Sequence, residues 1–137
     1  MDLARMKNAA ENGDAKIQLE LGQMYLCGRN VPEDNSEALK WFSMAAGQQN
    51  AEAQNCLGEM YQYGYGVSHN DVEAVKWYQK AVNGGSANGQ FRLGWMYEKG
   101  YGGLPRDKQK ALLYYKMAAK QGHSNAKTYV TMLEMGM

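Results

Sequence analysis

Leu57-Gly58-Glu59-Met60-Tyr61 is the stretch that decides the fold, because its pattern returns at a constant interval. Leucine, glycine, a variable residue, methionine and tyrosine also stand in this order at residues 21–25 and 93–97, so that neighbouring copies are 36 residues apart. Self-similarity with a period of about 20 to 50 residues is typical of repeat proteins. The chain is therefore predicted to be an array of short structural units.

A second pattern keeps the same interval. Residues 38–42, Ala-Leu-Lys-Trp-Phe, return as Ala-Val-Lys-Trp-Tyr at residues 74–78 and, displaced by one position, as Ala-Leu-Leu-Tyr-Tyr at residues 111–115. One inserted residue in the glycine-rich loop at residues 100–105 accounts for the displacement. Each unit thus contains an A helix with the Leu-Gly pattern and a B helix with the aromatic pair, which form an antiparallel pair.

The predicted fold is all-α: a single domain, residues 1–137, in which antiparallel helix pairs stack into an α-solenoid with about three full repeats. The expected units are residues 14–49, 50–85 and 86–122, with half-repeats at residues 1–13 and 123–137 that cap the ends. The expected helices span residues 2–12, 14–27, 34–47, 50–63, 71–83, 86–99, 107–120 and 123–135.

The spacing within a repeat predicts which side chains meet. Leu21, Met24 and Tyr25 lie at positions i, i+3 and i+4 of a helix, so they share one face and are expected to pack on the following B helix. Each full repeat has a glycine at the position of Gly58, although glycine in a helix interior costs about 1 kcal/mol relative to alanine. We therefore expect a neighbouring helix to approach the backbone closely at this glycine.

Composition narrows the classes of function. The chain has 15 basic and 14 acidic residues, so no broad field would draw it to nucleic acid or to an anionic membrane. No apolar stretch approaches the roughly 18 residues of a membrane span, and the first residues do not resemble a secretion signal. We expect a cytoplasmic protein, or a periplasmic or secreted one if a signal segment was removed. Cys27 and Cys56 are expected to be free thiols.

No combination of residues in the chain indicates catalysis. His69 and His123 stand in separate turns between helices, where we expect both to face solvent, and no metal-binding or phosphate-binding motif is present. Residues 124–127 match the Ser-x-x-Lys pattern of penicillin-recognising enzymes, but they align with the openings of the A helices at Ala51 and Ala87. We expect no catalytic residue, no metal and no cofactor; a weak β-lactam-type hydrolase is the least favoured alternative.

The repeated residues resemble the Sel1-like repeat, a relative of the tetratricopeptide repeat. The middle unit is the closest match, with Leu57-Gly58 and Tyr61 in its A helix and Asp71, Ala74 and Trp77-Tyr78 in its B helix. The resemblance implies a superhelix whose A helices line a concave surface that binds proteins or peptides. It predicts a non-catalytic scaffold or adaptor, as in bacterial signalling, envelope or host-interaction complexes.

The register carried over from this family selects the side chains that line the concave surface. Phe91 and Trp95 are four residues apart on one helical face, and Asn55 and Glu59 stand at the same places one repeat earlier. The two aromatic side chains are either anchors for a partner or space-filling groups between adjacent A helices. The predicted partner-binding residues are Gln23, Glu59, Gln62, Tyr63, Phe91, Trp95, Glu98 and Lys99.

Self-association is the second predicted function. A short solenoid has two open ends, and the ten methionines supply adaptable apolar surface that could form a homo-oligomer. Polar residues at the ends argue for capping, since Arg5 stands where full repeats have Trp41, and Thr131 where they have Gly58. These substitutions predict a nearly complete domain.

Overall fold

The computed structural model describes all residues from Met1 to Met137, which form eight α-helices and no strand. The predicted all-α fold is confirmed, and every predicted helix boundary lies within one residue of the observed one. Most differences arise because the predicted first residue, such as Asp34, is the N-cap, whose side chain accepts a hydrogen bond from a backbone N–H of the first turn. The helices are α1 (Leu3–Glu11), α2 (Ala15–Cys27), α3 (Asn35–Gly47), α4 (Ala51–Tyr63), α5 (Asp71–Asn83), α6 (Ala87–Lys99), α7 (Lys108–Lys120) and α8 (Ser124–Glu134).

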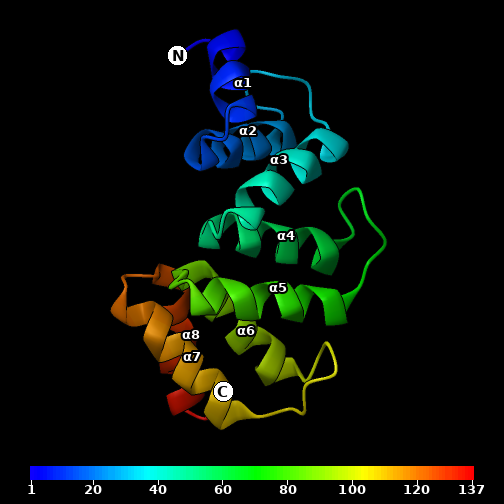
Figure 1. Cartoon of the computed structure of the whole chain (residues 1–137). Coiled ribbons are helices and arrows are strands. Elements are labelled where there is room, and N and C mark those ends of the chain that lie inside the picture. Colours follow the sequence, from blue (N-terminus) through cyan, green and yellow to red (C-terminus); the bar gives the residue numbers. More distant parts are fainter.

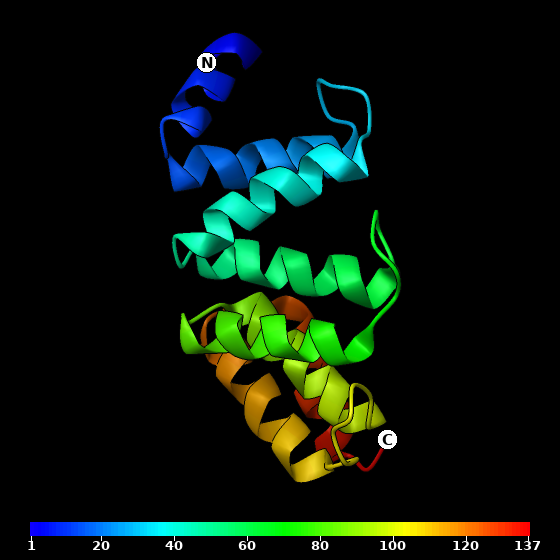
Figure 2. The same cartoon turned by 45° about the vertical axis from the view of Figure 1, so that its right-hand side comes forward.

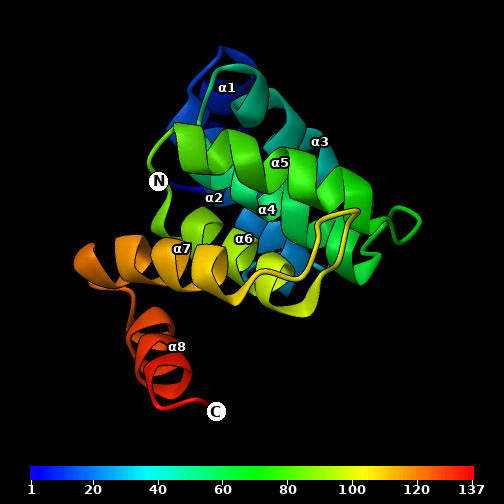
Figure 3. The same cartoon turned by 90° about the horizontal axis from the view of Figure 1, so that it is seen from below.

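The helices stack in chain order, so that the two termini lie at opposite ends of an elongated molecule (Figure 1 and Figure 2). Helices α2, α4, α6 and α8 are the A helices, and α1, α3, α5 and α7 are the B helices. Seen along the stack, α6 lies between α5 and α7 (Figure 3). The three loops that lead from an A helix to a B helix all lie on one side of the stack (Figure 1). We call this side the loop side.

The recurrent glycine is the point at which the A and B helices of one repeat come closest. A Cβ atom placed on Gly58 would lie 2.5 Å from Cε1 of Tyr78, which is closer than van der Waals contact permits. The predicted close approach is therefore present, and the partner is the second aromatic residue of the B helix. The equivalent contacts join Gly22 to Phe42 and Gly94 to Tyr115.

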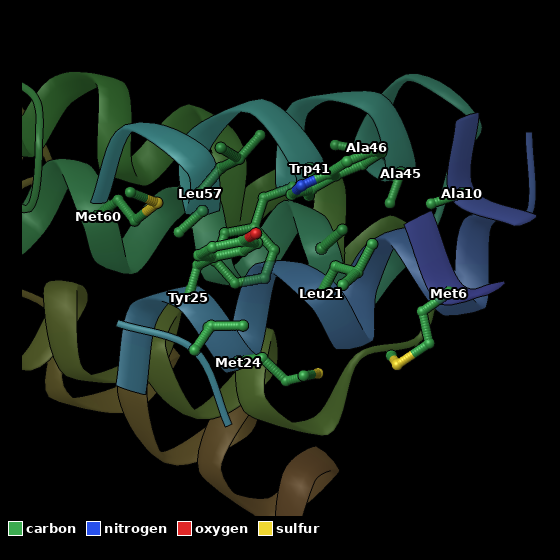
Figure 4. Packing of buried hydrophobic residues seen from close by; sticks show 14 residues of the cluster. Met6, Ala10, Leu21, Met24, Tyr25, Trp41, Ala45, Ala46, Leu57 and Met60 are labelled. Carbon is green, nitrogen blue, oxygen red and sulfur yellow. The ribbon is translucent and has the colours of Figure 1, made fainter. Parts of the chain in front are cut away.

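The core is continuous through the stack because each of the B helices α3, α5 and α7 is covered by A helices on both sides. Trp41 of α3 is 1 % exposed and belongs to the same buried cluster as Tyr25 of α2 and Leu57 of α4 (Figure 4). Its small neighbours Ala38 and Ala45 are completely buried. A second cluster, which includes Tyr78 of α5 and Tyr115 of α7, continues the core toward the C-terminal end.

The end helices carry the polar substitutions that capping requires. Arg5, Thr131 and Glu134 are all exposed, although the equivalent positions in full repeats are mostly apolar and buried. Glu134 forms an ion pair with Lys116 at 3.5 Å. None of the helices combines the length and the apolar character that a membrane crossing needs.

Candidate functional site

The A helices present adjacent surfaces whose polar side chains meet across the repeats. Asn88 of α6 donates a hydrogen bond to Glu52 of α4 over 3.0 Å, and these residues are 36 positions apart. Arg92 of α6 donates to the hydroxyl of Tyr63 of α4 over 2.7 Å. The ring of His123, the N-cap of α8, lies 2.9 Å from the side-chain oxygen of Asn88. Helices α4, α6 and α8 therefore contribute to one surface, which we call the A surface.

Glu59 and Arg92 form the charged centre of the A surface. Glu59 Oε2 lies 3.5 Å from the Arg92 guanidinium, and Glu59 Oε1 accepts a hydrogen bond of 2.7 Å from the amide of Asn55. Burial of the Glu59 carboxyl raises its pKa, while the Arg92 charge and the Asn55 hydrogen bond act in the opposite direction. Because burial is the larger effect, the pKa of Glu59 is above its ordinary value.

We expect the substitution Arg92→Gln to raise the pKa of Glu59 further, because it removes the positive charge that favours the carboxylate. The folded state already binds this proton more tightly than the unfolded chain, so stability falls as pH rises from the unfolded pKa to the folded one. In the variant this loss should extend to higher pH. Carbon NMR titration of the side-chain carboxyl measures the pKa; an unchanged or lowered value would contradict the arrangement.

Phe91 is buried and is not presented on the A surface. Its side chain is 7 % exposed; its ring stacks on His123 with centroids 4.7 Å apart and meets the edge of Tyr129 at 5.1 Å. Its place therefore agrees with the second of the two interpretations, in which it fills the space between adjacent A helices. The expectation that His123 faces solvent holds only in part, because its ring is partly exposed but packs on Phe91 while its Nδ1 atom accepts the Ala126 N–H. Burial lowers the pKa of His123.

Two further predicted residues form hydrogen bonds with the aromatic rings of the core. Gln62 is buried and accepts a hydrogen bond from the Tyr78 hydroxyl. Glu98 accepts one of 2.7 Å from the Tyr115 hydroxyl, and Lys99 lies 3.8 Å from the same carboxylate. Gln62 and Glu98 thus position the two tyrosine rings that face the recurrent glycines.

Gln23 lies on α2, the A helix that precedes the three helices of the A surface. It is partly exposed, and its hydrogen bond to Cys56 opposes the effect of burial, which raises the pKa of the Cys56 thiol. Cys27 and Cys56 are both free thiols, as predicted. The partly exposed amide of Gln23 therefore lies beside the thiol of Cys56, which stays protonated at neutral pH.

Tyr63 and Trp95 are brought together in a hollow on the loop side. The hollow has a volume of about 360 Å³ and is lined by Gln62, Tyr63, His69, Asp71, Trp95 and Tyr101. Tyr63 and Tyr101 are each 46 % exposed, and the rings of Trp95 and Tyr101 meet edge to face at 5.4 Å. Gly64 positions this wall, because its left-handed backbone, with φ of 70°, ends α4 and turns the chain toward Tyr65. We call this depression the aromatic hollow.

A second hollow lies at the equivalent position of the preceding repeat. It measures about 310 Å³ and is lined by Leu26, Cys27, Glu33, Asn35 and Tyr65. Every one of these residues is 36 positions before a residue of the aromatic hollow. The two hollows are neighbours, since the rings of Tyr63 and Tyr65 lie 5.7 Å apart. We call it the aliphatic hollow.

Several residues that contribute to the A surface or the aromatic hollow were not among the predicted partner-binding residues. Arg92 stands where Cys56 and Glu20 stand in the other repeats, so its charge breaks the pattern, and this break is a signal that the sequence contains. Asp71 and Tyr101 belong to the loops and the first turn of a B helix, outside the A-helix positions on which the prediction was based. Only the folded loops place them beside Trp95.

The fold and these contacts define the class of protein, an α-solenoid of antiparallel helix pairs with side chains exposed along one surface. The profile of the Sel1 repeat matches residues 15–50, 51–86 and 87–123. The chain therefore belongs to the Sel1 repeat family, as its repeated residues predicted. Members of this family are generally scaffolds for protein interaction rather than enzymes.

Solved structures and a curated protein are similar to this chain. A Sel1 repeat protein from Oxalobacter formigenes is 37 % identical, with a TM-score of 0.81 over 95 % of this chain and 97 % of that one. A protective antigen of uropathogenic Escherichia coli is 38 % identical, with a TM-score of 0.85 over 92 % of this chain and 27 % of its own. The secretory immunoglobulin A-binding protein EsiB of Escherichia coli is 42 % identical over 45 residues, which are 33 % of this chain and 9 % of that protein. The chain thus spans a small part of both E. coli proteins.

Proposed function

We propose that this protein is a non-catalytic binding module that holds a segment of another protein over its two hollows. The observation that carries the proposal is the aromatic hollow, where Tyr63, Trp95 and Tyr101 do not belong to the repeated core positions and remain partly exposed. Aromatic side chains in a depression are the usual anchors of protein interfaces. Helical repeats hold such groups on a rigid frame, which limits the entropy lost on binding.

The polar surroundings suit a peptide or protein segment better than an apolar small molecule. Arg92 donates a hydrogen bond to Tyr63 at the aromatic hollow, and Glu52 and Asn88 form a polar pair at the other end of the same two helices. Interfaces between proteins combine a few apolar anchors with a polar rim of this kind. The name of EsiB supports a protein as the class of partner, and an adaptor role follows if the chain holds such a partner for a second one.

A selection of random short peptides displayed on phage tests the proposal with no assumption about the sequence of the partner. Peptides that the wild-type protein enriches should bind the double variant Tyr63→Ser, Trp95→Ser at least about tenfold more weakly, because anchor residues typically contribute more than 1 kcal/mol each. The matched control is Trp77→Ser, since Trp77 is a partly buried tryptophan on B helix α5, outside both hollows.

Circular dichroism should show that all these variants remain helical. If the selected peptides bind the double variant as tightly as the wild-type protein, or if Trp77→Ser weakens them equally, the hollows are not the binding site. Failure to enrich any peptide above an unrelated helical protein would count against a peptide-binding function altogether.

A further inference from the structure

The two hollows occupy equivalent places and each has one carboxylate, but the carboxylates stand at different positions of the repeat. Asp71 is the first residue of B helix α5, and the corresponding first residues are Asn35 in α3 and Lys108 in α7. A carboxylate therefore stands at this position in the aromatic hollow alone. The aliphatic hollow has the neutral amide of Asn35 in its place.

The carboxylate of Asp71 pairs with His69 alone. Its oxygen lies 3.0 Å from Nε2 of His69, and neither a lysine nor an arginine of the chain forms an ion pair with it. The nearby cations have other partners, since Arg92 pairs with Glu59 at 3.5 Å and Lys99 with Glu98 at 3.8 Å. The helix N-terminus adds about half a positive charge, which is smaller than the full charge of the Asp71 carboxylate, while Glu73 of the same turn pairs with Lys76 at 4.0 Å. The rim at Asp71 thus has a net attraction for a cation.

The rings of the aromatic hollow are arranged so that a cation is favoured beside Asp71. The chain's own Arg92 lies 5.6 Å from the ring centroid of Tyr63, and Lys99 lies 5.9 Å from that of Trp95, which are cation–π distances. No basic side chain of the chain lies over the ring of Tyr101.

The loop brings this free ring to the carboxylate. A Cβ atom on Gly102, the residue after Tyr101, would lie 2.6 Å from the backbone carbonyl oxygen of Asp71. The loop that carries Tyr101 therefore rests directly on the first turn of α5. The lining of the hollow thus offers a cation an electron-rich ring with no basic partner, that of Tyr101, and a carboxylate, that of Asp71.

We propose that the aromatic hollow receives a basic side chain, arginine or lysine, from the bound segment of the partner. The inference rests on the proposed function and specifies the chemistry of one anchor. The neighbouring aliphatic hollow, lined by Leu26, Cys27 and Tyr65, has its own carboxylate on Glu33. A partner segment is thus recognised by a basic residue at one anchor position.

The test uses capped five-residue peptides in which a central arginine, lysine or glutamine is flanked by glycines. Binding is followed by the NMR signal of the Trp95 indole N–H, assigned with the variant Trp95→Leu. The arginine and lysine peptides should shift this signal and bind about tenfold more tightly than the glutamine peptide. The variant Asp71→Asn should weaken the arginine peptide about fivefold, because it removes the charge and keeps the shape.

Glu33→Gln is the matched control, because Glu33 stands at the edge of the aliphatic hollow and its loss changes the net charge equally. It should leave the affinity for the arginine peptide within about twofold, as expected for a charge outside the aromatic hollow. Equal weakening by Asp71→Asn and Glu33→Gln would show a general field and overturn the inference. Equal binding of the glutamine peptide, or no response of the Trp95 signal, would also overturn it. If phage selection yields peptides that depend on Tyr63 and Trp95 but lack basic residues, the proposed function stands and this inference falls.

Discussion

Gly58→Ala is expected to destabilise the protein by about 2 to 3 kcal/mol, although alanine favours a helix by about 1 kcal/mol over glycine. The added methyl group would lie 2.5 Å from the ring of Tyr78. That ring is completely buried and its hydroxyl is held by Gln62, so it has no space into which it could move. The overlap therefore outweighs the gain in helix propensity. The midpoint of thermal unfolding, followed by circular dichroism, should fall by roughly 5 to 10 °C.

Gly47→Ala is the control with the opposite expected sign. Gly47 ends α3, its backbone is not left-handed, and a Cβ atom there would meet no atom within 4 Å. The substitution should leave stability unchanged or raise it by up to about 1 kcal/mol. If both glycine substitutions raise the unfolding midpoint, the close approach of the A and B helices does not limit the side chain at residue 58.

Phe91→Ala is expected to cost about 3 to 5 kcal/mol, because it removes a buried ring at a junction of three helices. Phe91 contacts Tyr115 of α7 as well as His123 and Tyr129, which hold α8 against the stack. Chemical unfolding should show the loss, and hydrogen exchange in α8 should accelerate much more than exchange in α3. This pattern distinguishes a packing residue from a surface anchor.

Trp95→Ala is the comparison for Phe91→Ala, since the two residues lie one helical turn apart. Trp95 is only partly buried, so its loss should cost about 1 to 2 kcal/mol and leave exchange in α8 nearly unchanged. Similar losses of stability in both variants would contradict the distinction between a core ring and an exposed ring.

The sequence predicted the helices closely because their signals are local. Polar caps such as Asp34 and Asn70 stand immediately before the apolar pattern of a B helix, and Gly64 follows that of an A helix. The interval of 36 residues then fixed the register of the repeats. Even the meeting of Gly58 with a neighbouring helix could be predicted, since a costly glycine that recurs needs a reason in packing.

The candidate site was predicted less completely, because it depends on contacts between units. Phe91 and Trp95 lie on the same face of α6, and the sequence alone gives no reason to expect one of them to be more buried than the other. Their burial differs because Tyr129 and His123 of α8 fold over Phe91, while the one aromatic ring that pairs with Trp95 is Tyr101, at 5.4 Å. The position of α8 results from the stacking of whole repeats, which no local pattern encodes.

The sequence by itself determined that this chain is a Sel1 repeat solenoid, with its helix boundaries and the pairs of helices that pack together. The physical reason is that caps, apolar periodicity and the recurrent glycine act over one or two helical turns. Only the tertiary structure decided which aromatic side chains remain exposed and that Asp71 lies beside Tyr101, thirty positions along the chain. Those outcomes depend on how the loop at residues 100–103 rests on α5 and how α8 closes over α6, and both are set by the packing of successive repeats.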